Sequence, residues 1–299
     1  MAQSYPERSV RLVVGSATGG GGDLTARLVA KGMSEYWGQA VVVENMPGAS
    51  QSIAVAKVAT SPTDGYTLGW ITSAVLGTAL YADLSHNVER DLVPVVLVAT
   101  GPAVLVVNSE LPVHNVKELI ELARSEPGKL NYGSGGIGTT SHLIGELFNQ
   151  MSNIQTVHVP YPSTAKSAIA IASGEVQIGY PSFVATMPLI QANKLRALAV
   201  SGTKRWSVMP SLPTIGETLP GFNMGDWYGL FAPAGISKER LAELTKVAVM
   251  VASDPELTKS LEEHGLQPTI LVSDEFAAKI HNDFAVYTEL ATKLGLKPN

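Results

Sequence analysis

Two glycine-rich loops are the segments of this sequence whose residue types and spacing could bind an anion. Residues 15–23 read GSATGGGGD and residues 133–141 read GSGGIGTTS. Each loop follows a short β-branched run and precedes a segment with helical periodicity, so each should end at a helix N-terminus. Glycine lets the backbone approach a ligand, and the first helical turn offers unpaired N–H groups with a partial positive charge. The loops are therefore predicted to bind carboxylates.

Neither loop carries a complete motif for catalysis or nucleotide binding. The first lacks the Gly-Lys-Ser/Thr ending of a P-loop. The second matches G-x-G-x-x-G at Gly133, Gly135 and Gly138, but the following strand supplies no acid for a ribose. Tyr132 stands where the first glycine of a G-x-S-x-G nucleophile elbow belongs. That both loops are only tight strand–helix turns remains an alternative.

A few other polar residues could contribute to a site. Thr72 and Ser73 end an expected strand and could donate hydrogen bonds to a ligand. Asp23 is expected in the first turn of its helix, in a structural role. The six histidines show no HxH or HExxH spacing and cysteine is absent, so no metal site and no cofactor are expected.

Composition narrows the class of protein. The 299 residues suggest one large or two moderate domains. Zero Cys excludes a disulfide scaffold and an iron–sulfur cluster. The net charge of −5 argues against a nucleic-acid partner. The longest uncharged apolar run, Val93 to Val107, is too short to insert into a membrane, is interrupted by Pro and Gly, and is interpreted as two buried strands around a turn.

The elements around the loops follow an alternation of strands and helices, which predicts an α/β architecture. Continuous β-branched runs predict strands covered on both faces, as in mostly parallel sheets. Expected strands are residues 11–14, 40–43, 66–71, 95–99, 104–107, 130–132, 156–159, 176–180 and 197–200. Asn115, Asp254 and Ser273 are expected helix caps. The apolar stripe of the last helix is expected at Phe276, Ile280, Phe284, Tyr287, Ala291 and Leu294.

Two Pro/Gly-rich segments, residues 99–102 and 220–223, are candidate hinges. Two crossings would make residues 101–222 one domain, and residues 1–100 plus 223–299 the other. That is the layout of a clamshell whose ligand cleft lies between the domains.

The sequence resembles the Bug (Bordetella uptake gene) receptors, the solute-binding proteins of tripartite tricarboxylate transporters. The resemblance covers nearly the whole chain in order. Besides the first glycine loop, it rests on Tyr5-Pro6, residues 10–14, 41–49, 62–68, 127–132, 145–148, 158–161, 194–200 and 229–235.

The resemblance implies a two-domain, type II-like periplasmic-binding-protein clamshell that is no enzyme. It implies a monomer that binds a small carboxylate and delivers it to the membrane components of the transporter. A signal peptide would then be missing from the N-terminus of this sequence; a cytosolic protein is the alternative. The ligand-binding residues that the loops, the strand end at residues 72–73 and the resemblance together indicate are Ser16, Ala17, Gly20, Gly21, Thr72, Ser73, Ser134, Gly135, Gly138, Thr139, Thr140, Tyr161, Ser163, Thr164, Ser182 and Phe183.

Departures from the family pattern bear on the ligand. Gly15-Ser16 replaces the usual Pro-Phe, which should enlarge the cleft and add a hydroxyl. The Asp that many members carry near Pro181 is absent, which argues against an amino-acid ligand. We therefore expect a larger dicarboxylate, with aromatic ones such as terephthalate included. No Arg lies in either loop, so oriented dipoles should recognise it. A ligand sensor for a membrane regulator, a hydrolase or dehydrogenase, and a ligand-free structural domain are the rival readings.

Overall fold

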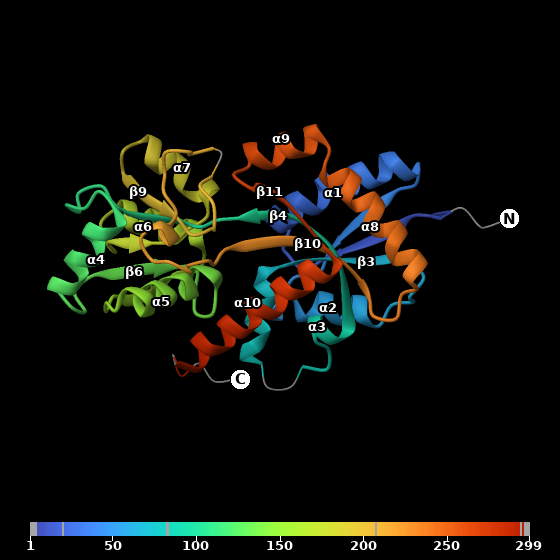
Figure 1. Ribbon diagram of the computed structural model, residues 1–299, viewed down its shortest axis with the longest axis horizontal. Coiled ribbons are helices and arrows are strands. Elements are labelled where there is room, and N and C mark those ends of the chain that lie inside the picture. Colours follow the sequence, from blue (N-terminus) through green and yellow to red (C-terminus); the bar gives the residue numbers. More distant parts are fainter. Residues whose placement is uncertain (1–4, 20, 82–83, 207, 294, 296–299) are drawn as a thin grey trace.

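The computed structural model describes residues 5–19, 21–81, 84–206, 208–293 and 295. They form two lobes, each built around one β-sheet with helices on both faces (Figure 1). We call these lobes the six-stranded domain and the five-stranded domain. The expected two-domain α/β fold is confirmed.

The six-stranded domain has the strand order β11-β4-β10-β3-β1-β2. Its strands are β1 (Val10–Val14), β2 (Val41–Asn45), β3 (Thr67–Thr72), β4 (Leu92–Gly101), β10 (Asp226–Pro233) and β11 (Gln267–Val272). Its helices are α1 (Gly21–Trp37), α2 (Ser52–Ala59), α3 (Val88–Asp91), α8 (Lys238–Ala252), α9 (Pro255–Glu263) and α10 (Ser273–Lys293), with 3-10 turns η1 (Ala49–Gln51) and η2 (Ser73–Leu80).

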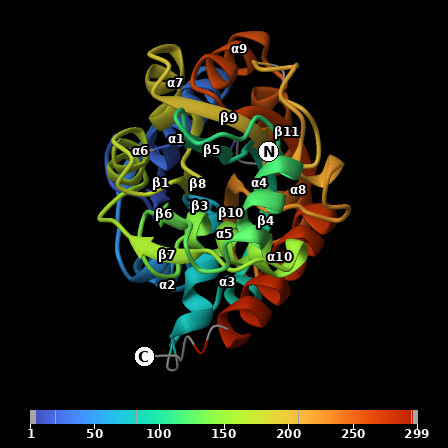
Figure 2. The ribbon, with the colours of Figure 1, turned by 90° about the vertical axis from the view of Figure 1, so that its left-hand side faces the viewer.

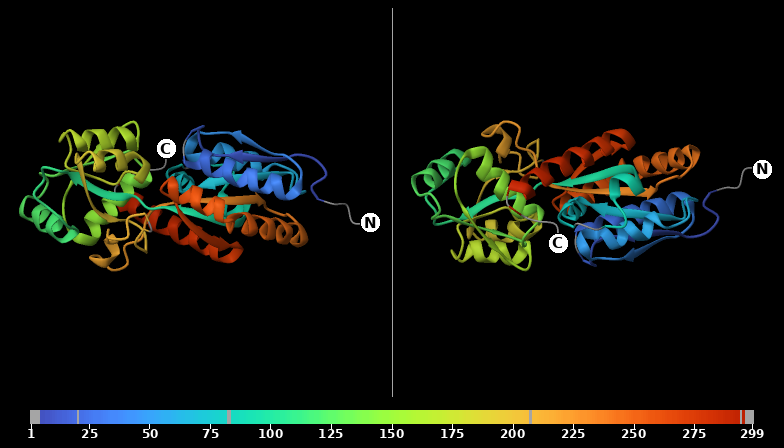
Figure 3. Two further views of the ribbon diagram at one scale, coloured as in Figure 1. Left: turned by 90° about the horizontal axis from the view of Figure 1, so that it is seen from above. Right: turned by 90° about the horizontal axis from the view of Figure 1, so that it is seen from below.

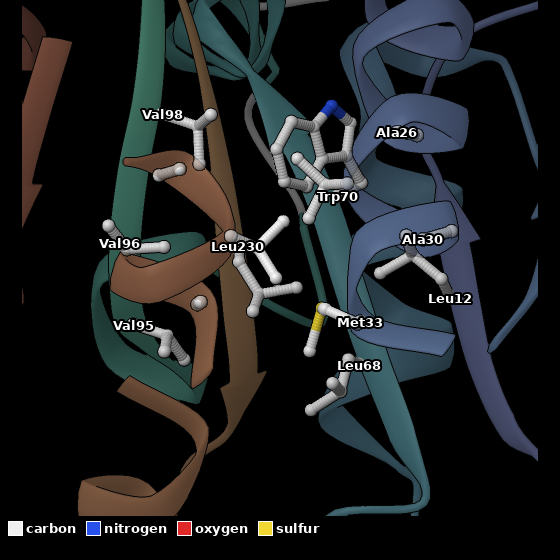
Figure 4. Close-up of a cluster of buried hydrophobic side chains, with 14 of the residues drawn as sticks. Leu12, Ala26, Ala30, Met33, Leu68, Trp70, Val95, Val96, Val98 and Leu230 are labelled. Carbon is white, nitrogen blue, oxygen red and sulfur yellow. The ribbon is translucent and has the colours of Figure 1, made fainter. Parts of the chain in front are cut away.

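Each face of this sheet carries its own apolar core. On one face Trp70, Leu12 and Leu230 pack with Met33 of α1, and all four are fully buried (Figure 4). On the other face the stripe of α10 packs against α2 and the sheet. The predicted stripe residues Phe276 to Ala291 are buried as expected, whereas Leu294 lies outside the described residues.

The five-stranded domain has the order β7-β6-β8-β5-β9. Its strands are β5 (Val104–Asn108), β6 (Asn131–Ser134), β7 (Val157–Pro160), β8 (Ile178–Gly179) and β9 (Leu195–Val200). Its helices are α4 (Val116–Ser125), α5 (Thr140–Ser152), α6 (Thr164–Ala172) and α7 (Phe183–Gln191), and η3 (Ile215–Glu217) is a 3-10 turn.

The sheets are mixed, which corrects the expectation of mostly parallel pairing. β1 is parallel to β2 and β3, and β6 to β7 and β8, while β10, β4, β11, β5 and β9 pair antiparallel. A strand buried on both faces reads as a continuous apolar run in either orientation, so the runs could not determine direction. β10 and β11 were not predicted.

The chain passes between the lobes near residues 101–104 and again before Asp226. β4 ends at Gly101 in one sheet and β5 begins at Val104 in the other, while β10 begins the return (Figure 3). Val93 to Val107 therefore contains two strands as predicted, in different sheets. Division at residues 101 and 223 stays a proposal.

Local helix signals were mostly predicted correctly. The Asn115 side chain accepts a hydrogen bond from the Glu118 amide at 2.9 Å and caps α4. Asp254 caps α9, with Pro255 as its first residue. Ser273 was predicted to cap the last helix but is instead the first residue of α10, with φ 38°.

Candidate functional site

A cavity of about 850 Å³ lies between the two domains. The six-stranded domain contributes the first glycine loop, the start of α1, and the turn after α9. The five-stranded domain contributes the starts of α6 and α7. The lining residues are Gly19, Gly21, Asp23, Leu24, Arg27, Gly101, Pro102, Thr164, Ala165, Ser182, Phe183, Ala185, Asp226, Tyr228, His264, Gly265 and Leu266.

The first glycine loop is held over the N-terminus of α1 by side chains of its own domain. The Asn45 amide donates to the Ser16 carbonyl and to Asp23 Oδ1, both at 2.9 Å. Asp23 Oδ2 accepts from the Gly19 amide at 3.0 Å. A Cβ on Gly22 would lie 2.2 Å from Ser16 Oγ, so glycine is required for the loop to close on the helix.

Asp23 is bound by an arginine that the sequence analysis did not select. Arg27, one turn further along α1, donates to Asp23 Oδ2 at 3.1 Å and lines the cavity. This guanidinium, with further hydrogen bonds from Gly19 and Asn45, lowers the pKa of Asp23 to about 2 against the opposing effect of burial. The expected structural role of Asp23 fits this network. The i, i+4 spacing of the pair was a visible signal for Arg27.

Thr72 and Ser73 lie where β3 ends, next to the start of α1. Thr72 is bonded to Gln51, whose Nε2 donates to Thr72 Oγ1 at 2.5 Å. A Cβ on Gly22 would be 3.1 Å from Thr72 Cγ2, which shows how close β3 and the loop are. The Ser73 hydroxyl donates to Asp226 Oδ1 at 2.8 Å and thereby connects the strand end to the cavity.

Asp226, the first residue of β10, is a functional candidate that sequence reasoning missed. It lines the cavity and accepts hydrogen bonds from Ser73 of the six-stranded domain and Thr140 of the five-stranded domain. Burial raises its pKa, and the two hydroxyls partly counter that effect. Within the described ranges no cation forms an ion pair with it. Its position beside the candidate hinge at residues 220–223 was the available signal.

Backbone amides of the second glycine loop donate hydrogen bonds within the loop and to the first turn of α5. Gly135 N donates to Ser141 Oγ at 3.0 Å, Gly138 N to His142 Nδ1 at 3.1 Å, and Thr139 N to the Gly136 carbonyl at 3.3 Å. Ser134 is fully buried, and its Oγ lies 2.6 Å from a histidine ring nitrogen on β7. These hydrogen bonds fix the loop in front of α5.

Two stacked histidines lie behind this loop. The rings of His142 and His158 have centroids 3.9 Å apart, and Tyr132 stacks on them. Burial, followed by the neighbouring His158, lowers the pKa of His142 to about 4. Burial also lowers the pKa of His158. His142 is therefore neutral at pH 7, which its role as acceptor for the Gly138 amide requires.

The second loop also contacts the six-stranded domain. Tyr287 of α10 donates its hydroxyl to the Gly138 carbonyl. A Cβ on Gly138 would lie 2.8 Å from Leu80 Cδ1, so η2 packs against the same glycine. α10 contacts α5, and Figure 1 shows it running toward the five-stranded domain, while Figure 2 shows the same region from the end of that domain.

The predicted site residues therefore fall into groups. Gly21, Thr164, Ser182 and Phe183 line the cavity. Ser73 and Thr140 bind Asp226, which lines the cavity. Ser16 and Thr72 lie against Gly22, which is not a lining residue but stands between the lining residues Gly21 and Asp23. The remaining described ones, Ala17, Ser134, Gly135, Gly138, Thr139, Tyr161 and Ser163, are not among the lining residues, and Gly20 lies outside the described residues.

Tyr161 and Ser163 have local roles in the structure. Tyr161 donates to Glu175 at 2.9 Å, and Ser163 caps α6 by accepting from the Lys166 amide at 3.2 Å. Trp70 and Trp227 are fully buried core residues, whereas Tyr228 belongs to the core and also lines the cavity.

Among the described residues, no helix combines the length and the apolar character that crossing a bilayer demands. No group of three or more His, Asp or Glu side chains there is arranged to hold a metal ion.

The chain is similar to known proteins along most of its length. Residues 25–296 match the family model described as tripartite tricarboxylate transporter family receptor. Protein BugT of Bordetella pertussis is 28% identical over 300 residues, which cover 99% of this chain and 92% of BugT. The structure of R. palustris Rpa4515 with adipate matches with a TM-score of 0.82 at 33% identity, covering 99% of this chain and 100% of that one. MatC from Rhodopseudomonas palustris with bound malate matches with a TM-score of 0.75 at 27% identity, over 96% of this chain and 99% of MatC.

Proposed function

The chain belongs to the tripartite tricarboxylate transporter receptor family, and from this premise we propose that it captures a small organic dicarboxylate between its two domains. Members of this family are receptors, so the chain is a solute-binding protein and not an enzyme. The finer statement, which ligand it captures and how, rests on the geometry of the cavity.

The observation that supports a dicarboxylate is the convergence of helix starts on one cavity. Gly21, Asp23 and Leu24 bring the first turn of α1 to it from the six-stranded domain. From the five-stranded domain, Thr164 and Ala165 bring the start of α6, and Ser182 and Phe183 that of α7. Helix starts offer unpaired N–H groups and partial positive charge, so each wall of the cavity can bind one carboxylate.

α7 offers the most open of these positions. Ser182 is its N-cap residue, is exposed, and its side chain makes no capping hydrogen bond. Its hydroxyl is therefore available to a ligand carboxylate, whereas the Ala185 amide of the same turn already donates to the Ser182 carbonyl at 3.1 Å. In α6 the Ser163 hydroxyl is itself engaged, because it accepts from the Lys166 amide.

The size and lining of the cavity suit dicarboxylates of several lengths. About 850 Å³ lies within the usual range for small-molecule sites. Phe183, Leu266 and Pro102 give part of the lining an apolar surface, against which a carbon chain or a ring can pack. Aromatic dicarboxylates such as terephthalate are thus included in the proposal beside aliphatic ones such as the adipate and malate of the two relatives.

A ligand bound to both walls favours the closed arrangement, because only that arrangement makes both sets of contacts. We place the protein in the periplasm, because similar solved structures include a periplasmic transporter and the periplasmic binding protein BugD. The closed form would be recognised by the membrane components of the transporter. Growth of a deletion strain separates this from a sensing role: a transport receptor is required for uptake, whereas a sensor is required only for induction.

The proposal is tested by thermal shift and calorimetry with mono-, di- and tricarboxylates, aliphatic and aromatic. A ligand at 100 times its Kd should stabilise the protein by about 2.7 kcal/mol. The variant Ser182→Asp places a carboxylate at the start of α7 inside the cavity, and should weaken dicarboxylate binding at least tenfold. Ser237→Asp is the matched control, because Ser237 caps α8 and does not line the cavity. The proposal is contradicted if no carboxylate shifts the melting temperature, or if both variants weaken dicarboxylate binding equally.

A further inference from the structure

The ionised carboxylate of Asp226 would repel a dianionic ligand bound in the cavity. Asp226 lines the cavity with Gly101 and Tyr228, and its carboxylate accepts hydrogen bonds from the hydroxyls of Ser73 and Thr140. Burial raises the pKa of this carboxyl and the two hydroxyl donors counter that effect, but they leave the negative charge of the ionised form in place. A ligand carboxylate beside the ionised form would be repelled, and no cation within the described residues forms an ion pair with Asp226 that would offset this.

The other charged and titratable groups on the cavity wall do not remove this problem. Arg27 is paired with Asp23, whose two oxygens lie 3.0 and 3.1 Å from guanidinium nitrogens. His264 is bonded through Nδ1 to the Ser260 carbonyl at 2.7 Å, at the end of α9. The pKa of the Tyr228 hydroxyl is raised by burial, so it remains neutral.

We propose that Asp226 accepts a hydrogen bond from the ligand, and that the preferred ligand is a dicarboxylate that also carries a hydroxyl or ammonium donor. The inference rests on the proposed function and narrows it. A donor between the ligand and Asp226 turns the repulsive contact into a charge-assisted hydrogen bond. The carboxylates remain at the helix starts, and the donor faces β10.

The sequence near Pro181 lacks the Asp that suits a ligand ammonium group, and this absence argues against an amino-acid ligand. Asp226 weakens that argument. The structure brings an acid to the same cavity from a different strand, since Asp226 and Ser182 both line it. A site for a ligand donor is therefore present although the sequence near Pro181 lacks one.

The test compares ligands that differ only in the donor. Calorimetry would measure the binding of glutarate, 2-hydroxyglutarate and glutamate, and of terephthalate and 2-hydroxyterephthalate. In the series that binds, the donor-bearing member should bind at least tenfold tighter than the plain diacid. The stronger of 2-hydroxyglutarate and glutamate identifies the donor as hydroxyl or ammonium.

Variants assign the preference to Asp226. Asp226→Asn keeps an oxygen that can accept from Ser73, and should reduce the preference to within about twofold. Asp274→Asn is the control for net charge, because Asp274 is exposed at the start of α10 and does not line the cavity. Equal affinity for plain and donor-bearing diacids in the unaltered protein overturns the inference, as does a preference that persists in Asp226→Asn. If no dicarboxylate binds in any arm, the proposed function itself fails.

Discussion

Protonation of His142 should destabilise the second glycine loop, and acid titration measures this directly. His142 is 4% exposed, and its Nδ1 accepts a hydrogen bond from the Gly138 amide. A proton on Nδ1 would remove that acceptor and place a buried positive charge against the ring of His158. The loop and the first turn of α5 would lose a hydrogen bond that defines their geometry.

The magnitude follows from the difference between the folded and unfolded pKa values of His142. The folded value is lowered to about 4, whereas an unfolded histidine titrates near 6.5. Between these values the unfolded chain binds more protons, so the free energy of unfolding falls as the pH falls. From roughly pH 7 to pH 5 the loss attributable to His142 is about 2 kcal/mol.

Urea denaturation between pH 7 and pH 5 is the assay. Most carboxylates remain ionised in both states over this range, so histidines dominate it. Asp226, whose pKa is raised, acts in the opposite direction, because its folded form takes up a proton first. That effect is common to all variants and cancels when their slopes are compared.

The variant His142→Asn isolates the effect. Its Oδ1 can accept from the Gly138 amide as Nδ1 does, and it does not titrate. On acidification, the free energy of unfolding of this variant should fall by about 2 kcal/mol less than that of the unaltered protein. The smaller contribution of His158 remains in the variant. His114→Asn, which replaces an exposed histidine, should keep the full pH dependence. Equal pH dependence in His142→Asn and the unaltered protein would refute the reasoning.

Three other substitutions test packing, the contact between domains, and capping. Gly145→Ala places a Cβ 2.3 Å from the ring of Tyr132 in a buried part of α5, and should cost about 2 kcal/mol in urea denaturation; no loss would contradict this packing. Tyr287→Phe removes the hydroxyl that binds the Gly138 carbonyl, and should cost about 1 kcal/mol, with faster amide hydrogen exchange in the second loop. Asn115→Ala removes the cap of α4, and should lower the free energy of unfolding by about 1 kcal/mol. Thermal melting measures this loss, with Lys117→Ala at an exposed position of the same helix as the control.

The sequence located elements well where the signal is local. Caps such as Asn115 and Asp254 act on amides two or three residues away, so spacing alone identifies them. Strand direction depends instead on partners far along the chain, and the valine-rich runs of β4 and β5 look the same in either orientation. β10, with glycine and aromatic residues in place of such a run, was missed because its burial comes from β3 and β4, which flank it.

The same distinction applies to the candidate site. The first glycine loop was found from its spacing, and Gly21 lines the cavity. Asp226 and Thr140 are 86 positions apart in the numbering and meet only because β10 returns beside the start of α5. A glycine pattern also cannot reveal whether amides are free: those of Gly135 and Gly138 are bound by Ser141 and His142.

Because amides of the second loop already donate to Ser141 and His142, we expect α6 and α7 to bind the ligand carboxylate in the five-stranded domain instead. An amide that already donates to a side chain must break that bond to bind a ligand. The glycines of the second loop are not among the lining residues, whereas Thr164 and Ala165 of α6 and Ser182 and Phe183 of α7 line the cavity. Under the proposed function, one carboxylate reaches α1 and the other reaches α6 and α7. A monocarboxylate can bind one wall but gains nothing from closure, because closure is favoured only by contacts that the open form lacks. Selectivity for two carboxylates, and closure on binding, then have the same physical origin.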